Sequence, residues 1–431
     1  MRASARRNAV GLRTGNDPRG LGHWVLRRYP VSILVIAPFA ILIVPMALLN
    51  GNPGTTFILR LLSVALVGTV LVETVALAAA PPRPGWRQRA AEANLAHPHL
   101  YRIARVVAVV SVVASLTGAY AGRGTIFTQL THDVAASPLA RVAALAAGWP
   151  YLAFALLVAS FLSGRVGRAR VLGWTGFVIA GQVTTVALTG IVSPAIGYIT
   201  FAAGAGAVCG LLRTRAVVAV GVVLLLAWPS LFAIRNEIRA EGGVSVSADV
   251  SAGDRLRVDL QLAEAGRYDV PVDVGQPGPT EFLRYGLVPR ILDQERPMIS
   301  TGALINQYLG GVATSSYSFL ALGNVYFFDG WLGVLLYYIG WASLVVLLLR
   351  RGAPGPVRLS LFCFVMGGPL LWSSTYPDSM IGFLQHAVAA LPVFALLWLT
   401  RRRTPGRRAP DRVPAPPRPG DVPVLSGSRL S

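Results

Sequence analysis

The sequence is poor in charge: only 13% of its 431 residues are charged, and lysine is absent altogether. A soluble globular domain carries about 25% charged residues, whereas 54% of this chain is apolar. The shortage of charge excludes a soluble protein and predicts an all-α, polytopic membrane protein. Cysteine is also scarce, and both copies, Cys209 and Cys363, lie inside apolar runs. That position favours packing over a disulfide or a metal pair.

The basic residues of the chain are all arginine. The 39 arginines outnumber the 19 acidic residues, which gives a net charge of +20. In a soluble chain this excess would indicate a nucleic-acid partner. In an apolar chain we expect the arginines to contact anionic membrane lipid instead, and we predict no nucleic-acid partner.

Ten apolar segments are each long enough to cross about 30 Å of hydrocarbon as a helix that rises 1.5 Å per residue. Of the 39 arginines, 28 lie in the two tails and in alternate loops between these segments. By the positive-inside rule, both termini face the cytoplasm. The predicted spans are residues 31–49, 57–80, 103–121, 138–162, 171–190, 194–212, 216–234, 330–349, 359–377 and 380–400.

The spans divide the chain into five parts. One loop breaks the charge pattern, since it holds 11 of the 19 acidic residues and 8 arginines. An extracytoplasmic activity is expected in this loop. The parts are a basic cytoplasmic tail (1–30), a membrane domain with seven spans (31–234), the large extracytoplasmic loop (235–316), an interfacial or re-entrant segment with three spans (317–400), and a disordered Arg/Pro-rich cytoplasmic tail (401–431).

The large loop begins with a pair of arginines. Arg235 and Arg239 are four residues apart, on one face of a helix that continues from span 7. Two guanidinium groups on one face can bind a diphosphate. Contact with lipid headgroups is an equally good explanation.

Further along the loop, residues 254–265 favour a short amphipathic helix, in which Arg255 and Asp259 are spaced i,i+4. Residues 270–280 are expected to be extended, because proline and glycine exclude a helix.

Three more arginines, Arg284, Arg290 and Arg296, lie among aromatic and apolar residues. Such a mixture can rest on a membrane surface and still present fixed positive charge. The alternative is that Arg290 and Arg296 pair with Asp293 and Glu295 and hold the loop together.

The segment before span 8 is too long to cross the bilayer as one straight helix. Residues 317–349 would measure about 50 Å, and Gly323, Gly330 and Gly333 offer positions for a break or for close helix packing. We expect residues 317–329 to form a short segment at the outer surface or dipping into the membrane, packed against the large loop.

Residues 281–345 contain a set of short motifs: Pro289-Arg290, Arg296-Pro297, Leu322-Gly323-Asn324, Tyr326 and Gly330-Trp331-Leu332-Gly333. This set resembles the oligosaccharide repeat-unit polymerases (Wzy-like proteins), which are relatives of the O-antigen ligases. The long outer loop and the tight turn at Gly190–Pro194 fit this family as well. The chain departs from it in lacking an arginine in that turn and in carrying Asn324 where an acid is usual.

The resemblance implies a polymerase that joins polyprenyl-diphosphate-linked repeat units into a surface polysaccharide at the outer face of the bacterial cytoplasmic membrane, with no metal or other cofactor. Its partners would be a lipid-linked glycan donor, a glycan acceptor and membrane lipid, with a flippase or chain-length regulator as further candidates. Arginines would neutralise the departing diphosphate, and aromatic rings would stack on sugars. The substrate-binding candidates are Arg235, Arg239, Arg284, Arg290, Arg296, Tyr317, Asn324, Tyr326 and Trp331.

The reaction also needs a group that positions or deprotonates the acceptor hydroxyl. Asp329 is the first choice, because it is the only acid between the large loop and the end of span 9. Its alternative role is to cap the helix that starts at Gly330. His386 is the next candidate and His132 follows, although either could be an ordinary hydrogen-bonded imidazole. Asp378 is expected to be a turn residue.

Other functions account for parts of the sequence. A glycosyltransferase with an acidic pair in its first outer loop is disfavoured, because Gly51–Thr56 contains no acid. A transporter or flippase of lipid-linked glycans predicts internal repeats and charges deep in several spans. Only Glu73 is clearly inside a span, where it can pair with a neighbouring helix. An O-antigen-ligase-type transferase remains an alternative, and a membrane scaffold has no need for an Arg-rich outer loop.

Overall fold

The computed structural model describes residues 26–79, 86–128, 137–241, 251–289, 292–293, 301–311, 316–350, 354–374 and 376–401. Every regular element within these ranges is a helix, which confirms the predicted all-α class. The predicted tails at 1–30 and 401–431 lie almost entirely outside the described residues.

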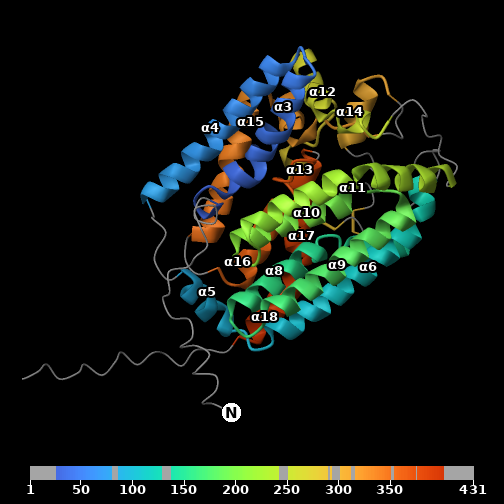
Figure 1. Cartoon of the computed structure of the whole chain (residues 1–431). Helices are drawn as coiled ribbons and strands as arrows, with labels where there is room; N and C mark the ends of the chain where they lie inside the picture. The colour runs from blue at the N-terminus through green and yellow to red at the C-terminus, as the bar shows by residue number, and fades with distance from the viewer. Residues whose placement is uncertain are drawn as a thin grey trace, which may run out of the picture.

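The elements are numbered in chain order, with η for short 3-10 or π helices (Figure 1). They are η1 (Ser32–Ile36), η2 (Phe39–Ile43), α3 (Val44–Leu49), α4 (Thr55–Ala79), α5 (Trp86–Leu95), α6 (Leu100–Thr128), α7 (Pro138–Ala144), α8 (Trp149–Leu162), α9 (Arg168–Thr189), α10 (Ser193–Val208), α11 (Thr214–Glu241), η3 (Asp254–Leu256), α12 (Val258–Glu264), η4 (Ala265–Arg267), α13 (Pro279–Leu287), α14 (Thr301–Tyr308), α15 (Leu320–Arg350), α16 (Pro356–Gly367), α17 (Asp378–Ala389) and α18 (Leu391–Leu399).

Eight helical segments of the described chain are long and apolar enough to cross a membrane. They coincide with eight of the ten predicted spans, as expected for a polytopic membrane protein. The predicted spans 194–212 and 359–377 are occupied by shorter apolar helices, α10 and α16, so the count of ten is not confirmed. Helix α16 has 12 residues, or about 18 Å. It stops at Gly367 because Gly368 and Pro369 cannot continue a regular helix.

Hydrogen bonds between loops gather at two ends of the helix bundle. The end that carries α5 and α18 lies at the bottom of Figure 1. There the Arg165 guanidinium donates to the carbonyls of Leu95 (3.0 Å) and His97 (3.1 Å), and Asn94 Nδ2 donates to the carbonyl of Pro354 (3.1 Å). The charge pattern assigns all of these loops to the cytoplasmic side.

The opposite end carries α12 and α14 (Figure 1). There the Asp378 carboxylate accepts from the backbone N–H (2.8 Å) and the hydroxyl (2.6 Å) of Thr301, and Ala321 N–H donates to the Trp372 carbonyl (3.0 Å). Asp378 is therefore more than a turn residue, because it fixes the start of α17 to α14. The sequence assigns Thr301 and Asp378 to outer loops, and which end faces the cytoplasm stays a prediction.

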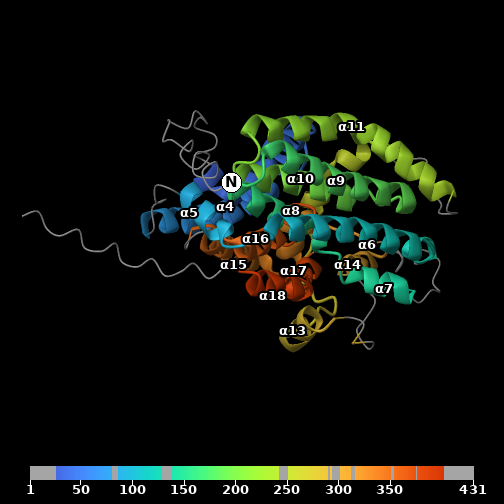
Figure 2. The ribbon, with the colours of Figure 1, turned by 90° about the horizontal axis from the view of Figure 1, so that it is seen from below.

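Helices α4 and α15 pack side by side. Gly68 allows this approach, since a Cβ there would come within 3.2 Å of the carbonyl oxygen of Leu335. Helices α6, α8 and α9 pack together, α16 lies against α8, and α11 lies outermost on α9 and α10 (Figure 2).

Glu73 of α4 joins that helix to the first span. It is fully buried and accepts from Val31 N–H (2.8 Å), Ser32 N–H (3.4 Å) and Ser32 Oγ (2.6 Å). Pro30 has no N–H and interrupts the helix just before these donors. The pairing with a neighbouring helix that the sequence suggested is confirmed.

Helix α15 is broken at Gly330, whose backbone has φ 64° and ψ −162°. This part of φ/ψ space is essentially restricted to glycine. The predicted break is therefore present, and it separates Leu320–Asp329 from the long apolar helix that follows. Residues 321–328 are all buried.

The segment before the break packs against the large loop, as predicted. A Cβ on Gly323 would meet Leu262 and Ala265, and Val272 N–H donates to the Phe327 carbonyl (2.9 Å). The short helix predicted at 254–265 is present as η3, α12 and η4. The chain is then extended up to Gly278, before α13.

Candidate functional site

A groove of about 570 Å³ follows one face of α15, between that helix and the start of α17. From Asp329 to Leu344 it accompanies about 22 Å of helix. Hydrocarbon surface dominates its walls, and Tyr337, one of its polar groups, already donates to the Pro369 carbonyl (2.5 Å). The lining residues are Asp329, Leu332, Gly333, Leu336, Tyr337, Gly340, Trp341, Leu344, Tyr376 and Met380.

Asp329 lies at the end of this groove next to the break, with its side chain exposed. The carboxylate lies over Gly333, where a Cβ would come within 2.0 Å of the Asp329 Cβ. Glycine at position 333 is thus required for this side-chain position. In the described part of the chain no backbone N–H donates to Asp329, so the geometry gives no support to the capping alternative.

The phenol of Tyr376 interacts with the Asp329 carboxylate in the same groove. Burial, together with the negative charge of Asp329, raises the pKa of Tyr376 well above its usual range. The phenol therefore keeps its proton at neutral pH and can donate to the carboxylate. This interaction places a proton donor beside Asp329 and leaves the rest of the carboxylate's acceptor capacity for a ligand.

An aromatic cluster lies on the other side of the break. Trp331 packs edge-on against Tyr326 (ring centroids 4.8 Å apart) and Phe57 (5.8 Å). Tyr326 is only 7% exposed, whereas Trp331 is 38% exposed. Of these two predicted sugar-stacking residues, Trp331 presents a face to a ligand and Tyr326 supports it.

Trp331 also lines a second groove, of about 510 Å³, against the first turns of α4. Its other residues include Arg60, whose side chain is exposed. Arg60 was not predicted as a site residue, because it lies inside the predicted span 57–80. A lone arginine in an apolar run was the signal that could have identified it. The remaining lining residues are Thr56, Leu59, Ser63 and Val64.

The structure does not bring together the described members of the five arginines predicted to bind diphosphate. Arg235 lies on α11, over the Phe232 ring (5.5 Å), and Arg284 on α13 pairs with the buried Asp293. Figure 2 shows α11 and α13 on opposite sides of the molecule, and α13 packs on α17 instead. Arg290, Arg296 and the side chain of Arg239 lie outside the described residues.

His386 does not reach the groove of Asp329. Its ring lies against Tyr151 (6.2 Å) and Phe364 (5.7 Å), on a different face of α17 from the groove residue Met380. Gly148 allows this position, because a Cβ there would come within 2.4 Å of the imidazole. The buried Nδ1 has no hydrogen-bond partner in the described chain. His132 lies outside the described residues.

Asn324 is fully buried and bonded to the protein at both ends of its amide. Its Oδ1 accepts from Phe319 N–H (2.9 Å), and its Nδ2 donates to Ser318 Oγ (2.8 Å) and the Ser374 carbonyl (3.2 Å). These contacts join the start of α15 to the α16–α17 turn. The Tyr317 ring packs edge-on against Phe319 (5.2 Å), also outside both grooves.

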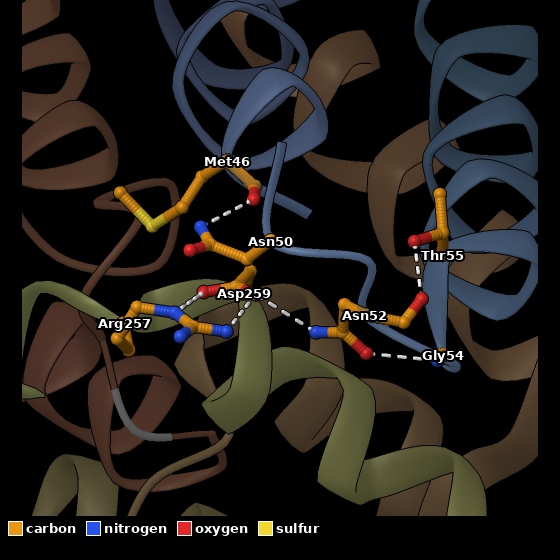
Figure 3. A network of polar contacts seen from close by, with 7 residues as sticks. All are labelled: Met46, Asn50, Asn52, Gly54, Thr55, Arg257 and Asp259. Atoms are coloured by element: carbon orange, nitrogen blue, oxygen red, sulfur yellow. Dashed lines mark hydrogen bonds and ion pairs between the residues drawn. The ribbon is translucent and has the colours of Figure 1, made fainter. Parts of the chain in front are cut away.

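A buried carboxylate connects the large loop to the first outer turn (Figure 3). Asp259 is fully buried and accepts from Asn52 Nδ2 (2.9 Å) and from Arg257 Nε (2.9 Å) and Nη2 (3.1 Å). Burial alone would raise the pKa of Asp259, but the hydrogen bonds from Arg257 and Asn52 hold it below its ordinary value. The charged network thus joins α12 to the turn between α3 and α4.

Comparison of the chain with protein-family models, with curated proteins and with solved structures finds no match. The described residues contain no group of three or more His, Cys, Asp or Glu side chains that could hold a metal ion. The two grooves that flank Gly330 are therefore the candidate functional site.

Proposed function

We propose that the protein is a membrane polymerase that joins polyprenyl-diphosphate-linked oligosaccharide repeat units at the outer face of the bacterial cytoplasmic membrane. The observation that carries this proposal is the groove along α15, with an apolar wall about 22 Å long and a single carboxylate at its end. An isoprenoid chain matches the wall, and a sugar hydroxyl matches the carboxylate.

In this proposal Asp329 accepts the proton of the acceptor hydroxyl as that oxygen attacks the anomeric carbon of the donor sugar. The bond from the anomeric carbon to the diphosphate oxygen breaks, and the lipid diphosphate leaves with the electron pair. Tyr376 orients the carboxylate by donating its phenolic proton in a hydrogen bond. Trp331 offers an exposed ring next to the reacting sugars.

The transporter alternative receives less support. Glu73, the acid that a translocation pathway would use, is occupied by three hydrogen bonds from Val31 and Ser32 and has no exposed surface. A carboxylate used in this way stabilises the helix pair rather than binding cargo.

Deletion of the gene in its host tests the proposal, with glycan length and lipid-linked intermediates as readouts. We expect long chains to disappear while single repeat units persist on lipid at the outer face. Accumulation of units at the inner face would make the protein a flippase, and unchanged glycan length would refute the polymerase. Retention of long chains that stay on lipid and are not transferred would identify a ligase.

A further inference from the structure

The second groove contains an arginine that has no partner among the described residues. Arg60 is the sixth residue of α4, within a segment apolar enough to span a membrane. No described residue forms a hydrogen bond or ion pair with its guanidinium. An unpaired cation in such a segment is unfavourable unless water, lipid or a ligand satisfies it.

The neighbours of Arg60 form a short polar stripe on an otherwise apolar helix. Thr56 and Ser63 lie one turn before and one turn after it, and all three line the groove with Trp331. Leu59, beside them, is 44% exposed. This combination of a fixed cation, two hydroxyls and an indole beside apolar surface suits a phosphate group carried on a lipid.

The two grooves differ in charge. Asp329 makes its own end of the first groove unfavourable for a diphosphate, because two negative charges repel at short range. The second groove has a cation and no acid among its lining residues. Only Gly330 separates Asp329 from Trp331 in the chain, so a phosphate at Arg60 would lie near the carboxylate without sharing its groove.

We propose that the groove formed by Arg60, Thr56, Ser63 and Trp331 binds the diphosphate of an isoprenoid lipid, with Arg60 as its main ligand. This inference deepens the proposed function and rests on it for the identity of the lipid. It assigns the diphosphate to α4 rather than to the arginines of the large loop.

Binding of farnesyl diphosphate to the purified protein in phosphatidylcholine nanodiscs tests the assignment by calorimetry. We expect Arg60→Gln to weaken binding at least tenfold and Arg60→Lys to weaken it less, since lysine keeps the charge but loses the bidentate fork. Arg141→Gln is the matched control, because Arg141 is an exposed arginine on α7 outside both grooves. It should bind as the wild type does.

A second pair of variants guards against misfolding of the Arg60 variants. Ser63→Glu places a carboxylate one turn from Arg60, where it competes for the guanidinium, and Ser63→Gln is its neutral control of similar size. Loss of binding in Ser63→Glu, with binding retained in Ser63→Gln, supports the site. Wild-type affinity in both Arg60→Gln and Ser63→Glu overturns it, as does an absence of binding to the wild type.

Nanodiscs that contain phosphatidylglycerol separate the two sources of lipid phosphate. If phosphatidylglycerol displaces farnesyl diphosphate at equal concentration, the groove is a general anionic-lipid site and the assignment is wrong. These measurements use no glycan. Arg60-dependent binding with unchanged glycan length after gene deletion would therefore refute the polymerase alone, and the reverse result would refute only this inference.

Discussion

The two ends of the α4–α15 pair differ in how their charged side chains are surrounded. At one end Glu73 is fully buried and accepts three hydrogen bonds from the first span. At the other end Arg60 has no partner among the described residues, and Asp329 is exposed in a groove with the phenol of Tyr376 beside it. A charge satisfied by its own protein stabilises the fold, whereas a charge left partly unsatisfied is available to a ligand.

The strongest test of this comparison is Glu73→Ala. The substitution leaves the buried donors of Val31 and Ser32 without an acceptor, so we expect a loss of about 3 kcal/mol or more in the free energy of unfolding. Thermal unfolding in detergent measures it. Glu92→Ala removes an exposed carboxylate from α5 and should change stability by no more than about 0.5 kcal/mol. Equal effects of the two substitutions would contradict a stabilising role for Glu73.

Asp329→Asn tests the other end of the pair. Asparagine keeps the shape and caps a helix about as well as aspartate, but it is no base. We expect unchanged melting and a fall of about a hundredfold or more in polymerisation rate. Asp273→Asn, which alters an exposed carboxylate in the large loop, should polymerise normally. Wild-type glycan length with Asp329→Asn would remove Asp329 from the catalytic residues.

Gly330→Ala tests whether the break in α15 is needed to keep Asp329 exposed at its end of the helix pair. Alanine at φ 64° and ψ −162° is strained, and we expect a loss of about 2 kcal/mol in stability together with reduced activity. Gly382 in α17 has open space around its Cα, so Gly382→Ala should be neutral or stabilising by up to about 1 kcal/mol. Equal stability of the two variants would show that the break tolerates a side chain.

Acidification should give the smallest effect. Because the pKa of Asp259 is lower in the folded protein than in the unfolded chain, its contribution to stability is present at neutral pH and is lost as the pH falls through the folded pKa. We expect the large loop to resist protease down to about pH 4 and to become susceptible below that. Asp259→Asn should show no such pH dependence, and loosening of the wild type at pH 6 would argue against the link.

Local sequence patterns predicted most of the membrane-spanning helices and the break in α15. Hydropathy located the spans because each depends on one continuous apolar run, and the break at Gly330 followed from a helix too long for the bilayer. The length of the span at α16 was overestimated, because the apolar run continues past Gly367 whereas the helix ends there.

The site itself depends on contacts that no local pattern encodes. Asn52 and Asp259 are 207 residues apart in the chain, and Tyr376 reaches Asp329 from the turn that precedes α17. The i,i+4 spacing pointed to Arg255, whose side chain lies outside the described residues. The partner that the structure describes for Asp259 is Arg257, which follows a 3-10 turn. Asp329 was predicted from its isolation among apolar residues and stays a prediction, whereas Arg60 was overlooked because it lies in a predicted span.

The break at Gly330 also sets a length scale. Asp329 and Trp331 are two residues apart, so their Cα atoms are separated by no more than about 7 Å. A donor lipid with its diphosphate at Arg60 and an acceptor glycan with its hydroxyl at Asp329 would meet across Gly330 without a domain movement. Each could arrive and depart sideways through the bilayer, so turnover would be set by lateral lipid traffic, and the rate would follow the fluidity of the membrane.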